Sequence, residues 1–568
     1  MDEASGTSQG RVSVRTVRLA VGFSLGAVAL AAHWPLFHAG LFVSDEELHW
    51  LRRLSEFDFT IHQGQWWPRW FPNLEWGHGY PYPNFYAPGG LWVSWFFLLL
   101  SASYLTGVKA AFLFAGLLAP FGMYRWLRPR VSRMAAVAGA LLYLLAPYHL
   151  LNIFVRGNLA EYLAMGLFPW VLWGFERLAA KQKAKDIALA SVLLCLFQLT
   201  HTLSALFGTG FLVGWLLLRL LVQRPSQSVL ISSAVTLGVG TLLGAIYWLP
   251  ALWDARYVRV ATLAEQIVAA DHVIYPWQLL DPRWGWGYSV PGPADQISLQ
   301  MGLPQFAAVV LALGALWRGR GDRKSLLVWT ILFIALILLL MPISVPLWQL
   351  PLMRMIQFPW RLLAWVAVAA AALGAMGLDA WGFRGKVIWA IVIVICLTTL
   401  VFARAEFFRE VNNINFIPEV TREHFRGNTG EDDYLPKWVL EKPGVPSLWR
   451  LLSRDPQAEI EFQGDEYFDR RWVIVSPSGG LVRYDIYRYP NWRISIDGEP
   501  IDDLTSAMDG TIVFPCPPGS HVIRIRWVAT PVQCVATGIS LLTALGLLFA
   551  MVGSTLRSRR GAIADEGR

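Results

Sequence analysis

Residues 91–130, LWVSWFFLLLSASYLTGVKAAFLFAGLLAPFGMYRWLRPR, decide how this chain is organised. They contain two apolar runs, 91–105 and 108–124, and then a cluster of arginines. A helix of about twenty apolar residues crosses a bilayer, and Lys and Arg gather at its cytoplasmic end. If both runs crossed, the arginine cluster would lie on the non-cytoplasmic side. We therefore expect 91–105 to be a short helix at the outer interface and 108–124 to be a span.

The composition is that of a membrane protein. Of the 568 residues, 55% are hydrophobic and only 15% are charged, and the mean hydropathy is +0.43. Backbone polar groups need partners in lipid, so helices are the expected spanning form. The formal net charge of +8 comes mainly from short basic clusters between apolar runs. It is therefore no argument for nucleic-acid binding, and no nucleic-acid partner is expected.

With 91–105 outside, every basic cluster falls on the cytoplasmic side and about twelve spans remain, with both termini cytoplasmic. The expected spans lie near 19–37, 108–124, 134–148, 159–175, 186–200, 204–222, 229–250, 303–317, 325–342, 361–381, 387–403 and 532–553. The cytoplasmic clusters are Arg11/Arg15/Arg18, Arg125/Arg128/Arg130/Arg133, Arg177/Lys181/Lys183/Lys185, Arg219/Arg224, Arg318/Arg320/Arg323/Lys324, Arg384/Lys386 and Arg557/Arg559/Arg560.

Three parts follow from this topology. A transmembrane domain at 1–405 contains a large first outer loop, 38–107. An outer soluble domain at 406–530 becomes β-rich from about 455, and 531–568 form the last span and a cytoplasmic tail.

The β-rich part is predicted from alternating apolar and polar residues. Ile523, Ile525 and Trp527 alternate with arginines, and Asp497-Gly498 is a strong hairpin signal. We expect a small antiparallel sandwich. A structural cap or a carbohydrate-binding module is the simpler interpretation of such a domain.

The first outer loop has the residues best suited to chemistry. It reads SDEELHWLRR at 44–53 and GQWWPRWFPNLEWGHGYPYPNFYAPGG at 64–90. A carboxylate there can act as a general base for an acceptor hydroxyl, and arginines can hold a phosphate. If the segment is helical, Asp45, His49 and either Arg52 or Arg53 share one face. The alternative is an interfacial helix with solvated charges. The aromatic residues either form an interfacial belt or stack on sugar rings.

Similar polar residues recur at the outer ends of other expected spans, where they could converge on one cavity. A lone His or Arg at a helix end is more often a snorkelling or capping residue than a ligand. The residues in question are Arg156, Glu161, His201, Gln357 and Arg361.

The loop motifs resemble a known family. D-x-x-x-H-x-x-R at Asp45–His49–Arg52, followed by GQWWPRWFPNLEWGHGYPYPNFYAP, is similar to the start of the bacterial membrane proteins labelled 6-pyruvoyl-tetrahydropterin-synthase-related, themselves similar to YfhO-type proteins. The name implies no pterin chemistry, since nothing here resembles that soluble enzyme. Further matches follow in the family's order: VRGNLAEY (155–162), LTHTLSAL (199–206), QFPWRLL (357–363), DYLPKW (433–438) and YPNWRISIDG (489–498).

The resemblance implies a GT-C-like glycosyltransferase fold and an inverting transfer of a sugar. The donor would be a polyprenyl-phosphate-linked sugar, and the acceptor a glycan, lipid or protein outside the cytoplasm. Asp45 would be the base, with Glu46 as the other candidate. Arginines would neutralise the lipid phosphate, two histidines would orient substrates, and Tyr434 would belong to a lid. The arginines in question are Arg52, Arg69, Arg156 and Arg361, and the two histidines are His49 and His201.

Two other functions stay open: a membrane scaffold that binds envelope glycans through its β domain, and a flippase or transporter for lipid-linked glycans. The helices carry few ionisable residues, which speaks against a transporter. A divalent ion could bind near Asp45 and Glu46, but no residue spacing requires it. The expected location is the bacterial plasma membrane, with the site facing outside.

Overall fold

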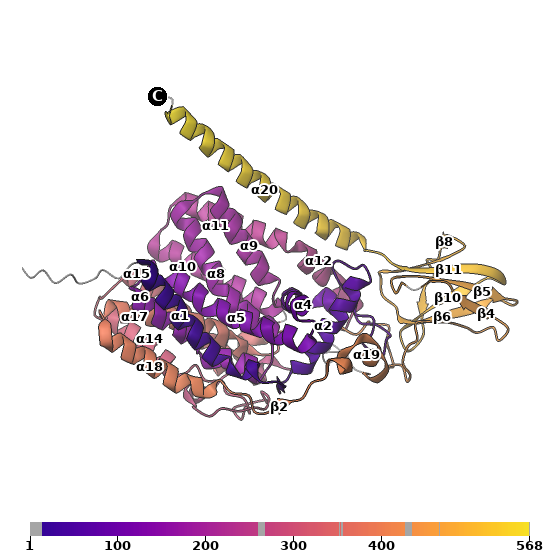
Figure 1. The fold of residues 1–568 in the computed structure, drawn as a ribbon, viewed down its shortest axis with the longest axis horizontal. Helices are drawn as coiled ribbons and strands as arrows, with labels where there is room; N and C mark the ends of the chain where they lie inside the picture. The colour runs from indigo at the N-terminus through magenta and orange to yellow at the C-terminus, as the bar shows by residue number, and fades with distance from the viewer. Residues whose placement is uncertain are drawn as a thin grey trace, which may run out of the picture.

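The computed structural model describes residues 14–259, 267–350, 353, 356–425, 434–464 and 466–566. Arg11 and the first residues of the EDDYLPKW segment, 431–433, lie outside the described residues. The described chain forms a helical bundle, a β domain beyond one end of the bundle, and a long last helix that runs back past it (Figure 1).

The bundle is built from helices of very different length. The longer ones are α1 (Val14–Ala32), α2 (Glu47–His62), α4 (Gly89–Ser101), α5 (Tyr104–Leu127), α6 (Arg133–Leu144), α8 (Leu159–Lys181), α9 (Ala184–Gln198), α10 (Thr202–Gln223), α11 (Gln227–Leu243), α12 (Ala245–Asp254), α14 (Leu303–Trp317), α15 (Arg323–Leu340), α17 (Leu363–Ala380), α18 (Gly385–Thr399) and α20 (Pro531–Glu566). The short ones are α3 (Tyr82–Phe85), α7 (Pro147–Phe154), α16 (Val345–Trp348) and α19 (Pro418–His424).

Helix α17 lies at the centre of the bundle. Its side chains are buried from Leu363 to Leu378, and most of them are small. Small residues let helix backbones approach closely in a membrane. At Gly377 an added Cβ would lie 2.9 Å from the Cα of Ala312 on α14. The tight packing of α17 against α14 therefore depends on the absence of a side chain at this position.

The expected polytopic helical architecture is confirmed. In the described chain, eight helices are long and apolar enough to cross a membrane, or nine if the pair α11 and α12, bent by 66°, counts as one span. The other expected spans, near 159–175, 186–200 and 303–317, form α8, α9 and α14, and the count of twelve stays a prediction. Run 91–105 forms α4, a helix of 13 residues. At 1.5 Å per residue, α4 is only about 20 Å long.

The C-terminal β-sheet region is also confirmed. One sheet has the order β3-β6-β10-β9 and the other β4-β5-β11-β7-β8. The strands are β3 (Leu451–Ser453), β4 (Glu459–Phe462), β5 (Asp469–Ser476), β6 (Gly480–Tyr487), β7 (Trp492–Ile496), β8 (Glu499–Pro500), β9 (Thr505–Ser506), β10 (Thr511–Cys516) and β11 (Gly519–Trp527).

The two sheets pack through aromatic side chains. Tyr484 on β6 meets Trp472 on β5 at a ring-centroid distance of 5.4 Å and Trp492 on β7 at 6.3 Å. The predicted hairpin joins β7 to β8. Its turn residues Asp497 and Gly498 have φ values of 51° and 93°, the left-handed backbone that this type of turn requires.

The segment after α18 returns to the first outer loop before it reaches the sandwich. Strand β2 (Phe408–Arg409) pairs with β1 (Leu41–Phe42), and α19 packs against α2. In Figure 1, α2 and α19 lie on the side of the bundle that faces the β domain. This segment therefore helps to hold the first outer loop in place.

Candidate active site

A cavity of about 540 Å³ lies beside the first outer loop. Its walls come from α2, the aromatic segment around α3, the turn between α7 and α8, the start of α10, and the segment before α17. Eight of the predicted site residues line it: Asp45, Glu46, His49, Arg156, His201, Gln357, Arg361 and Tyr434. Residues far apart in the sequence thus meet in one place.

Two loops dock on each other to form one wall of the cavity. The backbone N–H of Asp45 donates to Val155 O and that of Glu46 donates to Arg156 O, both at 3.1 Å. Gly157 has a φ of 62°, and an added Cβ there would lie 2.1 Å from Ser44 Oγ. A glycine is thus required at position 157, where the loop 155–158 contacts the segment 44–47.

The three adjacent carboxylates have different surroundings. Glu46 Oε2 accepts a hydrogen bond from Arg53 at 3.0 Å, and its Oε1 accepts one from Asn158 Nδ2 at 2.8 Å. Glu47 Oε2 accepts the backbone N–H of Ser44 at 3.0 Å. The Asp45 carboxylate has no hydrogen bond or ion pair with any residue that the structure describes. Of the three, Asp45 is therefore the one free to react.

The surroundings of Asp45 disfavour its charged form. Although its side chain is exposed to the cavity, the protein around it raises the pKa to about 7, mainly by desolvation. Arg156 opposes this shift, and the neighbouring charges of Glu46 and Glu47 add to it. A carboxyl group whose pKa lies near neutral pH is well suited to general-base catalysis.

Arg53 lines the cavity, and the predicted Arg52 does not. The Arg53 guanidinium lies 4.6 Å from the ring centre of Tyr82 and 5.2 Å from that of Tyr86. Arg52 instead lies 4.1 Å from the ring centre of Phe425, next to α19. Successive helix residues point about 100° apart, and the orientation of α2 places Arg53 on the cavity side.

Arg156 is held in the wall by a buried ion pair. Its Nη1 lies 2.7 Å from Glu161 Oε2 and also donates to Asn152 Oδ1 at 2.9 Å. Glu161 does not line the cavity; it lies behind Arg156, where it also accepts a hydrogen bond from Tyr148. The predicted substrate-binding residue Glu161 is thus placed to orient Arg156.

Arg361 is the cavity's unpaired cation. Within the described chain its side chain makes no hydrogen bond or ion pair, and its Nε is buried without a partner. Its guanidinium lies 5.6 Å from the ring centre of Phe358. Glu161 and Glu46 act on it only through space. A cavity guanidinium that is not engaged in an ion pair favours binding of an anionic ligand.

The two cavity histidines are neutral. Burial, together with the nearby charges of Arg53 and Arg52, lowers the pKa of His49 to about 3. Burial also lowers the pKa of His201 to about 3, and its Nδ1 is 2.9 Å from Ser204 Oγ. Both rings can therefore exchange hydrogen bonds with a substrate without adding charge.

Arg69, one of the predicted phosphate-binding residues, does not line the cavity. It is buried and donates to Asn84 Oδ1 and to Ile246 O, both at 2.8 Å. Asn84 in turn donates to Asp254 at 3.0 Å. Arg69 thus joins the aromatic segment to α12, and its hydrogen bonds serve the fold. Its position in an aromatic-rich loop gave no signal of this burial.

Tyr434 closes one side of the cavity. Its ring stacks on Phe85 at a centroid distance of 5.1 Å, and its backbone N–H donates to Tyr80 Oη at 3.1 Å. Other lining residues were missed because their sequence context is unremarkable, whereas Arg53 was the stated alternative to Arg52. The missed residues include Tyr82, Tyr86, Asn158, Ser289 and Trp360.

No group of three or more His, Cys, Asp or Glu side chains in the described part of the chain is placed to hold a metal ion. The divalent ion considered near Asp45 and Glu46 thus has no candidate ligand set among these residues.

A second, apolar groove of about 460 Å³ begins where the cavity meets α10. Thr202 lines both spaces. Thr202 Oγ1 is 2.6 Å from Tyr247 Oη, which also donates to Phe85 O. From this polar junction the groove follows α10 past Leu206 and Gly210 to Val213. The polar cavity thus adjoins the apolar groove.

The fold and the site define a multi-pass membrane protein with a polar cavity at one end of its helices. The family described as "6-pyruvoyl-tetrahydropterin synthase related domain; membrane protein" matches residues 84–407, more than half of the chain. The chain belongs to this family. A search of curated proteins gave no significant match.

Two solved structures are distantly similar. The arabinofuranosyltransferase AftD from Mycobacteria has a TM-score of 0.46 and 15% identity, over 69% of this chain and 27% of AftD. This chain thus spans about a quarter of the length of AftD. ArnT from Cupriavidus metallidurans, bound to undecaprenyl phosphate, has a TM-score of 0.41 and 14% identity, over 72% of this chain and 77% of ArnT.

Proposed function

We propose that this protein is a glycosyltransferase that uses a polyprenyl-phosphate-linked sugar donor. The observation that carries the proposal is an unpaired carboxylate, Asp45, in a cavity that also contains an unpaired arginine, Arg361. This pairing of a base with an anion-binding group suits transfer of a group away from a phosphate.

In the proposed reaction Asp45 accepts the proton of the acceptor hydroxyl. The acceptor oxygen forms a bond to the anomeric carbon of the sugar. The bond from that carbon to the phosphate oxygen breaks on the opposite face, and its electron pair leaves with the lipid phosphate. The configuration at the anomeric carbon is therefore inverted.

The lipid phosphate gains negative charge as it leaves, and arginines stabilise that charge. Arg361 is the primary candidate because its guanidinium makes no hydrogen bond or ion pair within the described structure. Arg156 is already paired with Glu161, so it contributes a fixed donor. His49 and His201, both neutral, orient the acceptor or the phosphate.

The apolar groove suits the hydrocarbon tail of the donor. Its lining is mostly apolar, and it meets the polar cavity at Thr202. A lipid phosphate with its headgroup in the cavity would thus have a path for its tail along α10.

We place the cavity on the outer face of a bacterial plasma membrane, with both termini cytoplasmic. Glu161 and His201 adjoin the cavity near the starts of α8 and α10, while Arg177 and Arg219 lie near the other ends of these helices. By the positive-inside rule, the arginine-rich ends are cytoplasmic.

The proposal is tested by profiling envelope glycans by mass spectrometry in native cells, in a deletion strain, and in the deletion strain with the gene restored. Loss of one sugar decoration in the deletion strain and its return on restoration are expected. The missing sugar then identifies the product. A profile that restoration of the 406–530 domain alone repairs would contradict transfer and favour a glycan-binding scaffold.

The transfer rate should depend on pH through the titration of Asp45. Its pKa is raised to about 7, and only the deprotonated form accepts a proton. The rate is therefore expected to rise as pH increases through about 7 and to level off above it. Initial rates in proteoliposomes at graded pH measure this, and a rate that does not change across this range would contradict Asp45 as the base.

Filling the apolar groove should block long-tailed donors. An added Cβ at Gly210 meets no atom within 4 Å, so Gly210→Trp is expected to fit and to occupy the groove. The rate with a polyprenyl donor should fall about tenfold or more through misplacement of the headgroup, while a short-chain donor is spared. Gly238→Trp, at an equally open position on α11 outside the groove, is the matched control. Equal loss in both variants would exclude the groove as the tail site.

A further inference from the structure

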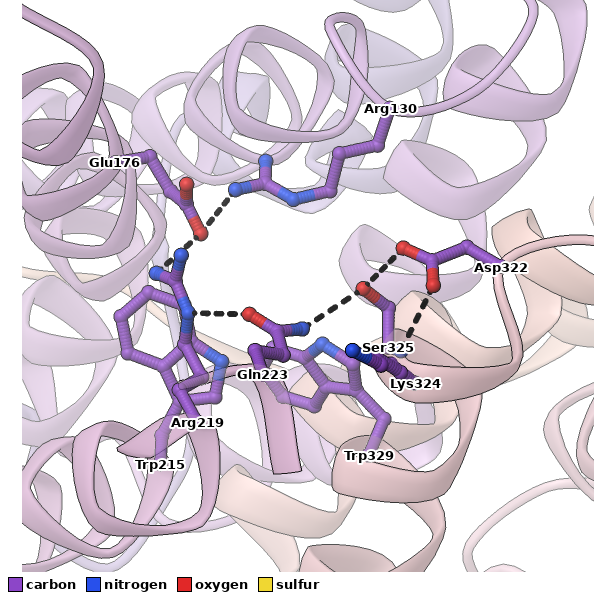
Figure 2. Close-up of a pocket in the computed structure, with 9 residues that line it drawn as sticks. All are labelled: Arg130, Glu176, Trp215, Arg219, Gln223, Asp322, Lys324, Ser325 and Trp329. Atoms are coloured by element: carbon purple, nitrogen blue, oxygen red, sulfur yellow. Dashed lines mark hydrogen bonds and ion pairs between the residues drawn. The ribbon is translucent and has the colours of Figure 1, made fainter. Parts of the chain in front are cut away.

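A second polar cavity lies at the end of the bundle remote from the candidate active site. It has a volume of about 280 Å³ and is lined by the ends of α8 and α10, the start of α15 and the turn after α5 (Figure 2). Glu176 lies 15 residues after Glu161 on α8. At 1.5 Å per residue, this separation is about 22 Å, so the two cavities lie near opposite faces of the membrane.

A chain of polar contacts forms the rim of this remote cavity. Arg130 and Arg219 both pair with Glu176 Oε1, Arg219 at 2.9 Å. Arg219 Nε also donates to Gln223 Oε1 at 2.9 Å, and Gln223 Nε2 donates to Ser325 Oγ at 3.1 Å. Figure 2 shows these side chains converging on the cavity from different helices.

The remote cavity carries an excess of positive charge. Its cations are Arg130, Arg219 and Lys324, and its carboxylates are Glu176 and Asp322. Asp322 is engaged in capping α15, where it accepts from the backbone N–H and the hydroxyl of Ser325. Lys324 has no hydrogen bond or ion pair with the residues that the structure describes. Three cations against two carboxylates leave one positive charge, which a phosphodiester would neutralise.

The walls and surroundings of the cavity suit a lipid better than a small soluble anion. Trp215 and Trp329, both buried, line it. The adjoining turns of α10 and α15 present exposed apolar side chains, including Leu221 at 71% and Leu327 at 40% exposure. A phosphate in the cavity would thus lie beside a surface for acyl chains.

We propose that this remote cavity binds the phosphodiester headgroup of an anionic membrane lipid. Arg219 and Lys324 supply the charge, the tryptophans hold the glycerol backbone, and the acyl chains lie along α10 and α15. Basic pockets between helix ends are suited to such lipids. The site is separate from the candidate active site and does not depend on the proposed transfer reaction.

The test is native mass spectrometry of the full-length protein taken from nanodiscs made of equal parts of phosphatidylglycerol and phosphatidylcholine. Wild-type protein is expected to retain phosphatidylglycerol selectively. Lys324→Gln should lower its retention about fivefold, as removal of one cation near a headgroup predicts. Arg219→Gln combined with Lys324→Gln should lower retention further.

Arg323→Gln is the matched control, because Arg323 is exposed like its neighbour Lys324 but does not line the cavity. It removes the same charge and should leave retention unchanged. Equal losses in both single variants would overturn the proposal, since the effect would then be general surface charge. Displacement of the lipid by millimolar inorganic phosphate would also overturn it, by assigning the cavity to a free anion.

Discussion

Asp45→Asn is expected to lower the rate of sugar transfer by about 10²–10⁴-fold, the usual contribution of a general base. The amide has nearly the same size as the carboxylate but cannot accept the acceptor's proton. The Asp45 side chain makes no hydrogen bond or ion pair within the described chain, so the substitution should leave folding and membrane insertion intact. Initial rates in proteoliposomes with a labelled lipid-linked sugar measure the effect.

Two further variants distinguish this role from a general effect of charge. Asp271→Asn removes an exposed carboxylate that does not line the cavity and should keep full activity. Glu46→Gln weakens the contact with Arg53, so it should reduce activity less than Asp45→Asn. An active Asp45→Asn protein together with an inactive Glu46→Gln protein would indicate that Glu46, and not Asp45, is the base.

Arg361→Ala is expected to lower the transfer rate by about 10²-fold, in line with the loss of one charged donor that stabilises a leaving group. Because Arg361 forms no ion pair in the described structure, its removal breaks none. The loss should therefore appear in the rate and not in the thermal stability. Single-turnover rates at saturating donor, together with a melting curve, measure both quantities.

Arg361→Lys provides a graded comparison. It retains the positive charge but loses the planar pair of donors that a phosphate can accept, so an intermediate rate is expected. Arg256→Ala, an exposed arginine outside the cavity, is the matched control and should be silent. An unchanged rate in Arg361→Ala would exclude Arg361 as the residue that stabilises the phosphate, and Arg156 would be examined next.

Much of the candidate site could be predicted from the sequence. The residues VRGN, LTHT and QFPWR were expected to converge because each lies at the outer end of an expected span, and members of all three line one cavity. The sequence could not show whether Arg52 or Arg53 lines the cavity, because that depends on how α2 is rotated against its neighbours. It also gave no sign that Arg69 is buried against α12.

The sequence by itself determined the features that depend on short stretches: the apolar helices, the short α4, and the hairpin at Asp497-Gly498. Each is specified by local hydrophobicity or by the backbone freedom of a few residues. Only the tertiary structure decided which carboxylate is free. Asp45, Glu46 and Glu47 are chemically alike and adjacent. Their surroundings differ because Asn158 and Arg53 engage Glu46, while Ser44 and Arg409 engage Glu47. Two of those partners could have been guessed from nearby sequence, but Asn158 is more than a hundred residues away and reaches Glu46 only through helix packing.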